Sequence, residues 1–209
     1  MKKQSQSPMK LVEAAFCIAY LIFVYIATLL FLWRGQHLYA ALAFCLALGD
    51  SFHLFPRIKI ALKGEGKDDF HRLQLGNIIS SVTVTLFYVI LYFIMKQIHA
   101  DLPVLFLHLL LALGAVRIYM LTMPQNDWFK RNSSENNWHI YRNIPFCLMG
   151  ILTIFYLILF CKRYFMALLV LISFACYMGT VILAKKDPKM GMLMIPKTIC
   201  YVWILAMFL

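Results

Sequence analysis

Acidic and charged residues are scarce in this chain. Only nine of its 209 residues are Asp or Glu, and charged residues of both signs make up 14% of the sequence, whereas 63% of the residues are apolar. A soluble domain of this length needs more polar surface than this composition supplies. The composition therefore excludes an ordinary water-soluble globular fold and favours lipid as the main solvent.

Paired cysteines are also missing. None of the six cysteines belongs to a Cys-x-x-Cys pair, and each lies inside an apolar run. We predict that they are small apolar side chains of the core rather than disulfide partners or zinc ligands. The scattered His and Asp residues show no metal-ligand spacing either, so we expect no bound metal and no other cofactor.

What the sequence does contain is a series of long apolar runs. A helix needs about 20 apolar residues to cross about 30 Å of hydrocarbon. Charged or turn-forming residues separate the runs, and the predicted spans are 11–33, 38–57, 74–95, 102–122, 143–161, 164–184 and 190–208. The predicted fold class is all-α: residues 1–209 form a single integral membrane domain, a polytopic transmembrane helical bundle with seven spans.

Lys and Arg are distributed unevenly between the two ends of these spans. Of the 20 Lys and Arg residues, 14 lie in the N-terminal segment or at the loops after the second, fourth and sixth spans, and four lie at the other loops. Because cytoplasmic loops carry the excess of positive residues, we predict that the N-terminus is inside and the C-terminus outside. We expect membrane lipids rather than nucleic acid as partners, and a multi-pass location in the cell membrane, the inner membrane of a bacterium.

Ionisable side chains inside a span are the best indicators of function, because they are costly in hydrocarbon unless they are paired or hydrated. Asp50 is the only acidic residue well inside a span, and His53 and Arg57 follow it at i+3 and i+7 on the same helix face. One interpretation is an ion pair of Asp50 with Arg or Lys that fixes helix packing. The other is a site carboxylate beside an imidazole, which makes Asp50 and His53 the candidate catalytic residues.

The third span carries hydrogen-bonding side chains at spacings of three and four residues. They are Gln74, Asn77, Ser81, Thr85, Tyr88 and Tyr92. This spacing predicts one polar stripe along the whole span. The stripe indicates either hydrogen bonds between helices or the wall of a water-filled substrate path. Asn77 and Ser81 are the two members that we expect in a binding site.

Basic side chains gather in the predicted cytoplasmic half. Arg117 lies near the end of the fourth span, and Arg142 and Asn143 lie at the start of the fifth. Lys197 lies in the seventh span, with Tyr201 one turn further along the same face. Each cation alone is typical of an anchor that reaches the membrane surface. Together they predict a cavity for an anionic group, such as the phosphate or carboxylate headgroup of an amphiphile.

The segment 49–57, with the sequence GDSFHLFPR, resembles the YhhN-like lysoplasmalogenases in its Gly-Asp, its Leu and its Pro-Arg near the end of an early span. These proteins are small polytopic membrane hydrolases that cleave the vinyl-ether bond of lysoplasmalogens. The resemblance implies that Asp50 is the catalytic carboxylate, assisted by His53. The segments 141–146 (YRNIPF) and 192–198 (MLMIPKT) resemble an uncharacterised bacterial family of polytopic membrane proteins.

Three functions remain open from the sequence. The first is a membrane-embedded hydrolase of a lysophospholipid-like substrate, whose anionic headgroup Arg57, Arg142 and Lys197 hold. The second is a transporter or channel for a small anionic or protonatable solute. The third is a ligand-binding sensory seven-helix bundle, in which Lys197 of the last helix stands where retinal could attach. A pocket open on one side favours the enzyme, and a polar path through both faces favours the transporter.

Overall fold

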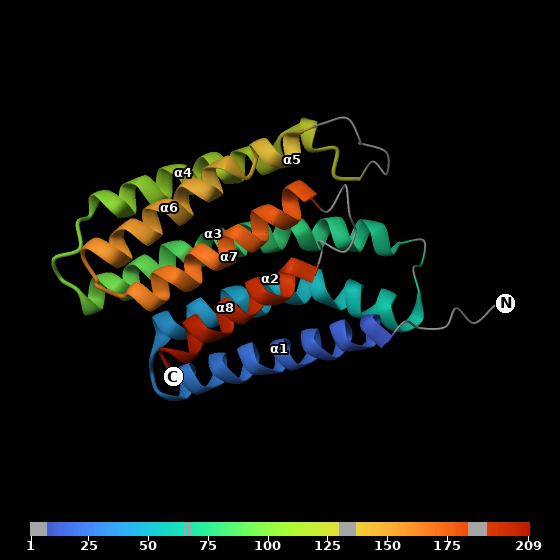
Figure 1. Ribbon diagram of the computed structural model, residues 1–209, viewed down its shortest axis with the longest axis horizontal. Helices are drawn as coiled ribbons and strands as arrows, with labels where there is room; N and C mark the ends of the chain where they lie inside the picture. The colour runs from blue at the N-terminus through green and yellow to red at the C-terminus, as the bar shows by residue number, and fades with distance from the viewer. Residues whose placement is uncertain (1–7, 65, 67, 130–136, 184–191) are drawn as a thin grey trace.

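The computed structural model describes residues 8–64, 66, 68–129, 137–183 and 192–209, and these residues are helical with no strand among them. The long helices are α1 (Pro8–Trp33), α2 (His37–Lys63), α3 (Asp69–Ile98), α4 (Leu105–Thr122), α6 (Ile144–Leu159), α7 (Tyr164–Leu183) and α8 (Met194–Ala206) (Figure 1). A 3-10 turn, η1 (Pro124–Asn126), and the four-residue α5 (Trp138–Tyr141) lie between α4 and α6. The predicted helical bundle is thereby confirmed.

Six of the described helices are long and apolar enough to cross a membrane, when α5 and α6 are taken together as Trp138–Leu159. The seventh, α8, has 13 residues, which at 1.5 Å per residue cover about 20 Å. The bundle is therefore compatible with a multi-pass membrane protein. Residues 184 and 190–191 of the last two predicted spans lie outside the described part of the chain.

Two helices are longer than the predicted spans. The second span was expected to end at 57, but α2 continues through Pro56 to Lys63. A proline inside a helix removes one hydrogen bond, yet Ile58 and Ile60 prolong the apolar run beyond it. The third span was expected to begin at 74, but α3 begins at Asp69. Polar residues at a membrane surface are compatible with helix, and hydropathy alone does not mark where such a helix ends.

Consecutive helices run antiparallel and contact each other, and α8 returns to contact α1, so that the helices form a ring in which α3 also contacts α6 (Figure 1). The start of α1 and the C-terminus lie at opposite ends of the bundle (Figure 1). We call the end at which α1 begins the basic end, because the described cations Arg57, Lys59, Lys63 and Arg72 lie in the turns of α2 and α3 at that end. The helices α2, α4 and α7 end there, and α3, α6 and α8 begin there.

Glycines allow α2 and α3 to approach closely. A Cβ atom on Gly76 of α3 would collide with the backbone carbonyl of Phe52, and one on Gly49 of α2 would lie 3.2 Å from the Cα atom of Ser80. Small residues permit this approach of two helices in membrane bundles. The contact places the residue after Gly49, Asp50, directly against α3.

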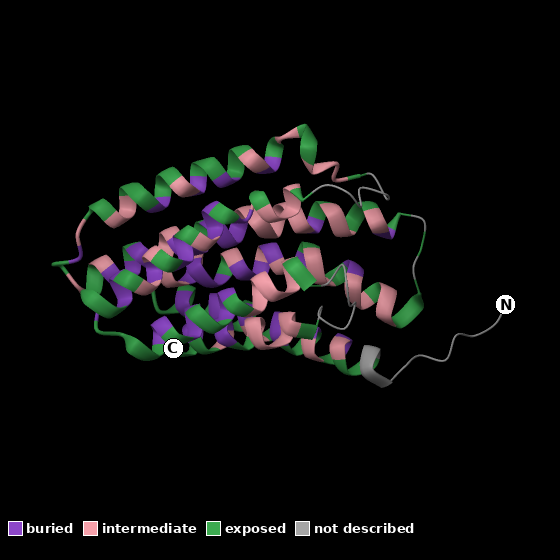
Figure 2. Cartoon of the chain, turned by 45° about the horizontal axis from the view of Figure 1, so that its top comes forward, coloured by how far each residue is buried: buried purple, intermediate pink, exposed green. Residues whose placement is uncertain are grey.

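Burial differs along the bundle. Buried residues concentrate in its middle and towards the C-terminus, whereas the basic end carries mainly intermediate and exposed residues (Figure 2). The aromatic side chains Phe87, Tyr88, Phe146 and Tyr156 are among the largest fully buried groups. The helices are thus closely packed in one half and leave space between them in the other.

Candidate functional site

A cavity of about 210 Å³ lies between the helices towards the basic end. Nine of the ten predicted site residues line this candidate cavity: Asp50, His53, Arg57, Asn77, Ser81, Arg117, Arg142, Asn143 and Lys197. They come from α2, α3, α4, α8 and the segment that opens α6. These helices alternate in direction, so side chains near the end of one helix and near the start of the next reach the same level. Their convergence is a structural finding, and their chemical roles remain predictions.

Asp50 is held by two hydroxyl groups. The Tyr20 hydroxyl of α1 donates to its Oδ2 at 2.5 Å, and the Ser80 hydroxyl of α3 donates to its Oδ1 at 3.4 Å. Among the described residues no Lys, Arg or His forms an ion pair with this carboxylate. Asp50 therefore makes no direct ion-pair contact among the described residues, although Lys197 lines the same cavity and attracts it electrostatically, so the pairing of Asp50 with a cation stays a prediction. One face of the carboxylate is fixed by hydroxyls while the group still lines the cavity.

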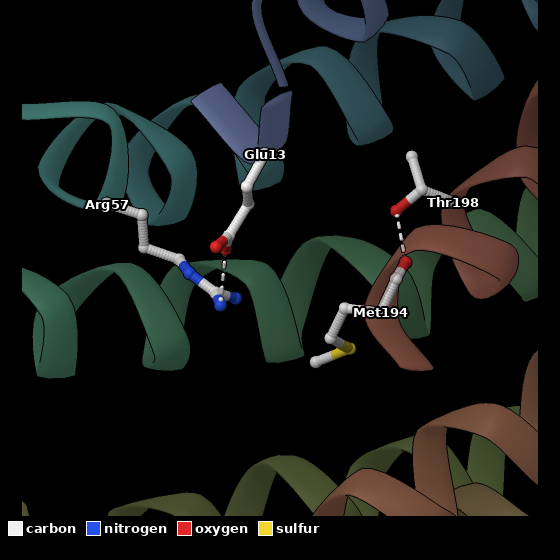
Figure 3. A network of polar contacts seen from close by, with 4 residues as sticks. All are labelled: Glu13, Arg57, Met194 and Thr198. Atoms are coloured by element: carbon white, nitrogen blue, oxygen red, sulfur yellow. Dashed lines mark hydrogen bonds and ion pairs between the residues drawn. The ribbon is translucent and has the colours of Figure 1, made fainter. Parts of the chain in front are cut away.

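Arg57 instead pairs with Glu13 of α1. Its Nη2 atom lies 2.9 Å from Glu13 Oε1, with side chains 30% and 37% exposed. Figure 3 shows these two side chains pointing at each other from α1 and α2. The first turn of α8 lies across from them, and there the Thr198 hydroxyl donates to the Met194 carbonyl at 2.8 Å. Arg57, Met194 and Thr198 all line the cavity. The ion pair therefore forms one side of the rim at the basic end.

His53 lines the same wall of α2 as Asp50. Its buried Nδ1 atom has no hydrogen-bond partner in the part of the chain described. A buried polar atom without a partner is uncommon, because its desolvation is not offset. The His53 ring is therefore free to bond a water molecule or a ligand in the cavity.

Arg117 is the most deeply placed cation. Its side chain is 1% exposed, its Nη1 atom donates to Thr85 Oγ1 at 2.9 Å, and its guanidinium lies 3.6 Å from the centroid of the Phe146 ring. Its Nε and Nη2 atoms have no hydrogen-bond acceptor within the described ranges. The expectation of an anchor that reaches the membrane surface is wrong for Arg117, because α4 turns it into the bundle. Two unused donors on a buried cation suit an anionic acceptor.

Lys197 and Arg142 are held by aromatic rings. The Lys197 ammonium lies 4.9 Å from the centroid of Tyr177 and 5.5 Å from that of Tyr201. Arg142 lies 3.9 Å above the ring of Trp128, and its Nη1 atom donates to the Asn126 side chain at 2.9 Å. Cation–π contacts hold a cation in place without neutralising it. Neither residue has an ion-pair partner in the described chain.

Asn143 and Tyr177 link α6 and α7 at the cavity wall. The Tyr177 hydroxyl donates to Asn143 Oδ1 at 2.8 Å, and Asn143 Nδ2 donates to the carbonyl of His139 at 2.8 Å. These bonds hold both side chains beside the cavity. Both polar atoms of the Asn143 side chain are therefore used in hydrogen bonds within the protein. We expect other residues of the cavity wall, rather than Asn143, to contact a ligand.

The polar stripe of α3 divides into two parts. Asn77 and Ser81 line the cavity, whose lining on α3 stops at Val84 among the residues described. Further along, the Tyr88 hydroxyl lies 3.3 Å from the Tyr201 hydroxyl, and the Tyr92 hydroxyl donates to the Pro103 carbonyl at 3.0 Å. The stripe thus changes from a cavity wall into contacts between packed segments.

Tyr201 does not line the cavity, in contrast to its prediction as a site residue. It belongs to a cluster of aromatic rings at centroid distances of 4.6 to 5.7 Å: Phe87, Tyr88, Phe146, Phe174 and Tyr201. We call the region of this cluster the closed half of the bundle. Tyr201 lies one turn beyond Lys197 and so falls among these rings. The cavity is consequently closed towards the C-terminal end.

Four residues that support the site were missed by the sequence analysis: Glu13, Tyr20, Ser80 and Tyr177. Glu13 and Tyr20 are seven residues apart on α1 and so share one face, which is a signal that the sequence contained. Ser80 lies beside Asn77 and Ser81 but interrupts the strict stripe spacing. Tyr177 shares its helix face with Ser173 and Thr180, at i−4 and i+3, and this spacing is a second signal that the sequence contained.

The fold and its cavity define an α-helical bundle of membrane-like composition with an internal pocket lined by several basic side chains. No protein-family model, curated protein or solved structure matches the chain. The functional argument therefore rests on the geometry of the cavity and on its charges.

Proposed function

We propose that the protein is a membrane-embedded hydrolase that binds the anionic headgroup of a lysophospholipid-like amphiphile in the candidate cavity. The observation that supports this proposal is the meeting of Asp50 and His53 with Arg57, Arg117 and Lys197 on the walls of one cavity. With the N-terminus inside, as the excess of Lys and Arg at the basic end indicates, the cavity opens to the cytoplasm. A bacterial inner membrane is the proposed location.

The headgroup site is proposed at Arg117 and Lys197, neither of which makes an ion-pair contact within the described chain. Arg117 has two nitrogen atoms, Nε and Nη2, whose N–H groups have no acceptor, and Lys197 is held by aromatic rings. Hydrogen bonds between a guanidinium or ammonium and a phosphate are short and strong. Arg57 is paired with Glu13 and lies at the rim of the cavity rather than at the base of the headgroup site. A single phosphodiester between Arg117 and Lys197 would neutralise one of these two positive charges.

Asp50 is the proposed acid–base group. For the vinyl-ether substrate that the lysoplasmalogenase resemblance implies, the Asp50 carboxyl donates its proton to the vinyl carbon distant from the ether oxygen. Water adds to the resulting oxocarbenium carbon, and its proton returns to Asp50, so that the group is regenerated. The hemiacetal then breaks down to a fatty aldehyde and a free glycerol hydroxyl. His53, with its unpartnered Nδ1, positions the attacking water.

The test compares two substrates of equal chain length, 1-alkenyl and 1-acyl lysophosphatidylethanolamine, with the purified protein in mild detergent. Products are followed by mass spectrometry as fatty aldehyde or fatty acid. We expect turnover by the wild type and a loss of about 100-fold or more in Asp50→Asn, because a positioned acid–base group contributes about 10²–10⁴ in rate. The matched control is Asp101→Asn, an exposed aspartate at the other end of the bundle. Absence of wild-type turnover on both substrates would overturn the hydrolase proposal.

A second candidate, transport of a small anion, is favoured by the size of the cavity. At about 30 Å³ per water molecule, 210 Å³ holds a headgroup-sized anion without a chain. Uptake of radioactive phosphate into proteoliposomes distinguishes the two candidates. Uptake that depends on Arg117, without turnover of any lipid, would replace the enzyme by a transporter.

A further inference from the structure

A second hollow lies on the face of α2 that points away from the candidate cavity. It has a volume of about 580 Å³ and lies between α1, α2 and α3. On α2 its wall is formed by Phe52, Phe55 and Lys59, which are spaced i, i+3 and i+7 and so share one helix face. Asp50 and His53 each lie two residues before Phe52 and Phe55, respectively. Their side chains therefore point to the opposite side of α2. We call this second hollow the outer groove.

The outer groove presents hydrocarbon to its surroundings. Phe52 is 45% exposed and Phe55 is 59% exposed, and Leu75 of α3 forms the facing wall. Its polar groups are bonded internally, since the Ser51 hydroxyl donates to the Ala47 carbonyl at 2.6 Å and lies 2.9 Å from the Tyr25 hydroxyl. An acyl chain that fills the groove can therefore cover these two hydroxyl groups without leaving them unbonded.

Two cations stand at one end of the outer groove. Lys59 follows Phe55 by four residues on α2, and Arg72 precedes Leu75 by three residues on α3. Because the two helices are antiparallel, both offsets point towards the basic end, by about 5 Å at 1.5 Å per residue. The groove is therefore apolar where it faces the hydrocarbon and cationic where it approaches the membrane surface.

The residues that line the outer groove include two cations and no carboxylate. Lys59 forms an ion pair with Asp69 at 2.7 Å, whereas the guanidinium of the exposed Arg72 has no hydrogen-bond or ion-pair contact among the residues described. The face of the groove itself is therefore cationic at this end. The geometry points to an anionic phospholipid of the surrounding bilayer as the occupant: one acyl chain lies along Phe52 and Phe55, and the phosphate lies against Arg72 and Lys59.

A different hollow on α6 provides an internal comparison. It measures about 270 Å³ and is lined only by apolar residues, among them Ile154, Phe155 and Ile158. Any acyl chain of the bilayer suits such a surface equally. A preference for anionic headgroups is expected at the outer groove and not at the α6 hollow.

The first experiment locates the bound lipid without altering the protein. Wild-type protein in phosphatidylcholine nanodiscs receives traces of phosphatidylglycerol or phosphatidylcholine with a photoreactive group in the acyl chain, and cross-linked peptides are identified by mass spectrometry. We expect phosphatidylglycerol to label the segment 48–59 at least about threefold more than phosphatidylcholine does. Equal labelling of that segment by both lipids, or the same preference at 151–159, would overturn the proposal.

The second experiment removes the free cation. Lipid retained by Arg72→Gln is measured by native mass spectrometry against the matched control Arg163→Gln, an exposed arginine at the opposite end of the bundle. One cation near the membrane surface is worth about a fivefold change in affinity for an anionic lipid. We expect that loss for phosphatidylglycerol in Arg72→Gln only, with lipid turnover unchanged, since Arg72 does not line the candidate cavity. Retention equal to that of the control would contradict the role of the groove while leaving the hydrolase proposal intact.

Discussion

Along α3, the closed half of the bundle and the half that contains the cavity differ in what surrounds each polar side chain. In the closed half, Tyr88 and Tyr92 are fully buried and bond to other protein groups. In the cavity half, Asn77 and Ser81 belong to the same stripe but border open space. Protein interiors are otherwise close-packed, so the loss of packing in one half shows where the helices leave room for another molecule.

The cations follow the same division. Arg117 lies at the boundary, with one N–H bonded to Thr85 and two donors unused. The guanidinium of Arg117 packs against the ring of Phe146, which belongs to the aromatic cluster. The packed side chains of the closed half thus hold the groups at the inner end of the cavity in place. Three experiments test this difference between the two halves.

The largest expected effect is on stability and separates the two halves. Leu91→Ala removes a fully buried side chain of the closed half, and we expect it to lower the free energy of unfolding by about 2–5 kcal/mol. The matched change is Leu54→Ala, which removes a leucine that lines the cavity, and here we expect a loss near 1 kcal/mol. Denaturant unfolding in mixed micelles, followed by circular dichroism, measures both. Equal losses would show that the two halves are packed alike.

The next effect concerns anion binding. Arg117→Met keeps most of the side-chain volume but removes the buried charge, so we expect stability to be unchanged or slightly raised. The affinity for glycerol 3-phosphate, measured by isothermal titration calorimetry, should fall by about 30-fold, since hydrogen bonds to charged groups contribute about 1.5–3 kcal/mol. Arg163→Gln serves as the control. An unchanged affinity in Arg117→Met would remove Arg117 from the site.

The smallest effect is expected at the rim. Glu13→Gln removes the carboxylate that pairs with Arg57 and so frees one cation beside the cavity. Exposed ion pairs are weak, so stability should change by less than about 1 kcal/mol. The affinity for glycerol 3-phosphate should rise about two- to threefold at low salt, and the gain should shrink as salt screens the charge. A lower affinity would mean that the pair itself shapes the opening.

Hydropathy was sufficient to predict the helical bundle, because lipid-compatible helices must be long and apolar. It did not predict that α2 continues to Lys63, because the span was ended at Pro56 and Arg57 although the apolar residues Ile58 and Ile60 carry the helix beyond them. The meeting of Asp50 and Lys197 in one cavity was predicted from their cost in hydrocarbon. The hydroxyl partners of Asp50 were not, because they depend on how α1 and α3 pack against α2. Gly49 and Gly76 permit the close approach of α3 to α2.

The aromatic cluster also has an electrical consequence. In an energised membrane, moving one charge through the full potential costs about 2.3 kcal/mol per 100 mV. A hydrated cavity conducts, so the voltage drop falls mainly across the dry layer formed by Phe87, Tyr88, Phe146, Phe174 and Tyr201. An anion that enters from the basic end and stops at Arg117 has crossed little of that field. The occupancy of an anion bound there, as proposed, should therefore be almost independent of membrane voltage.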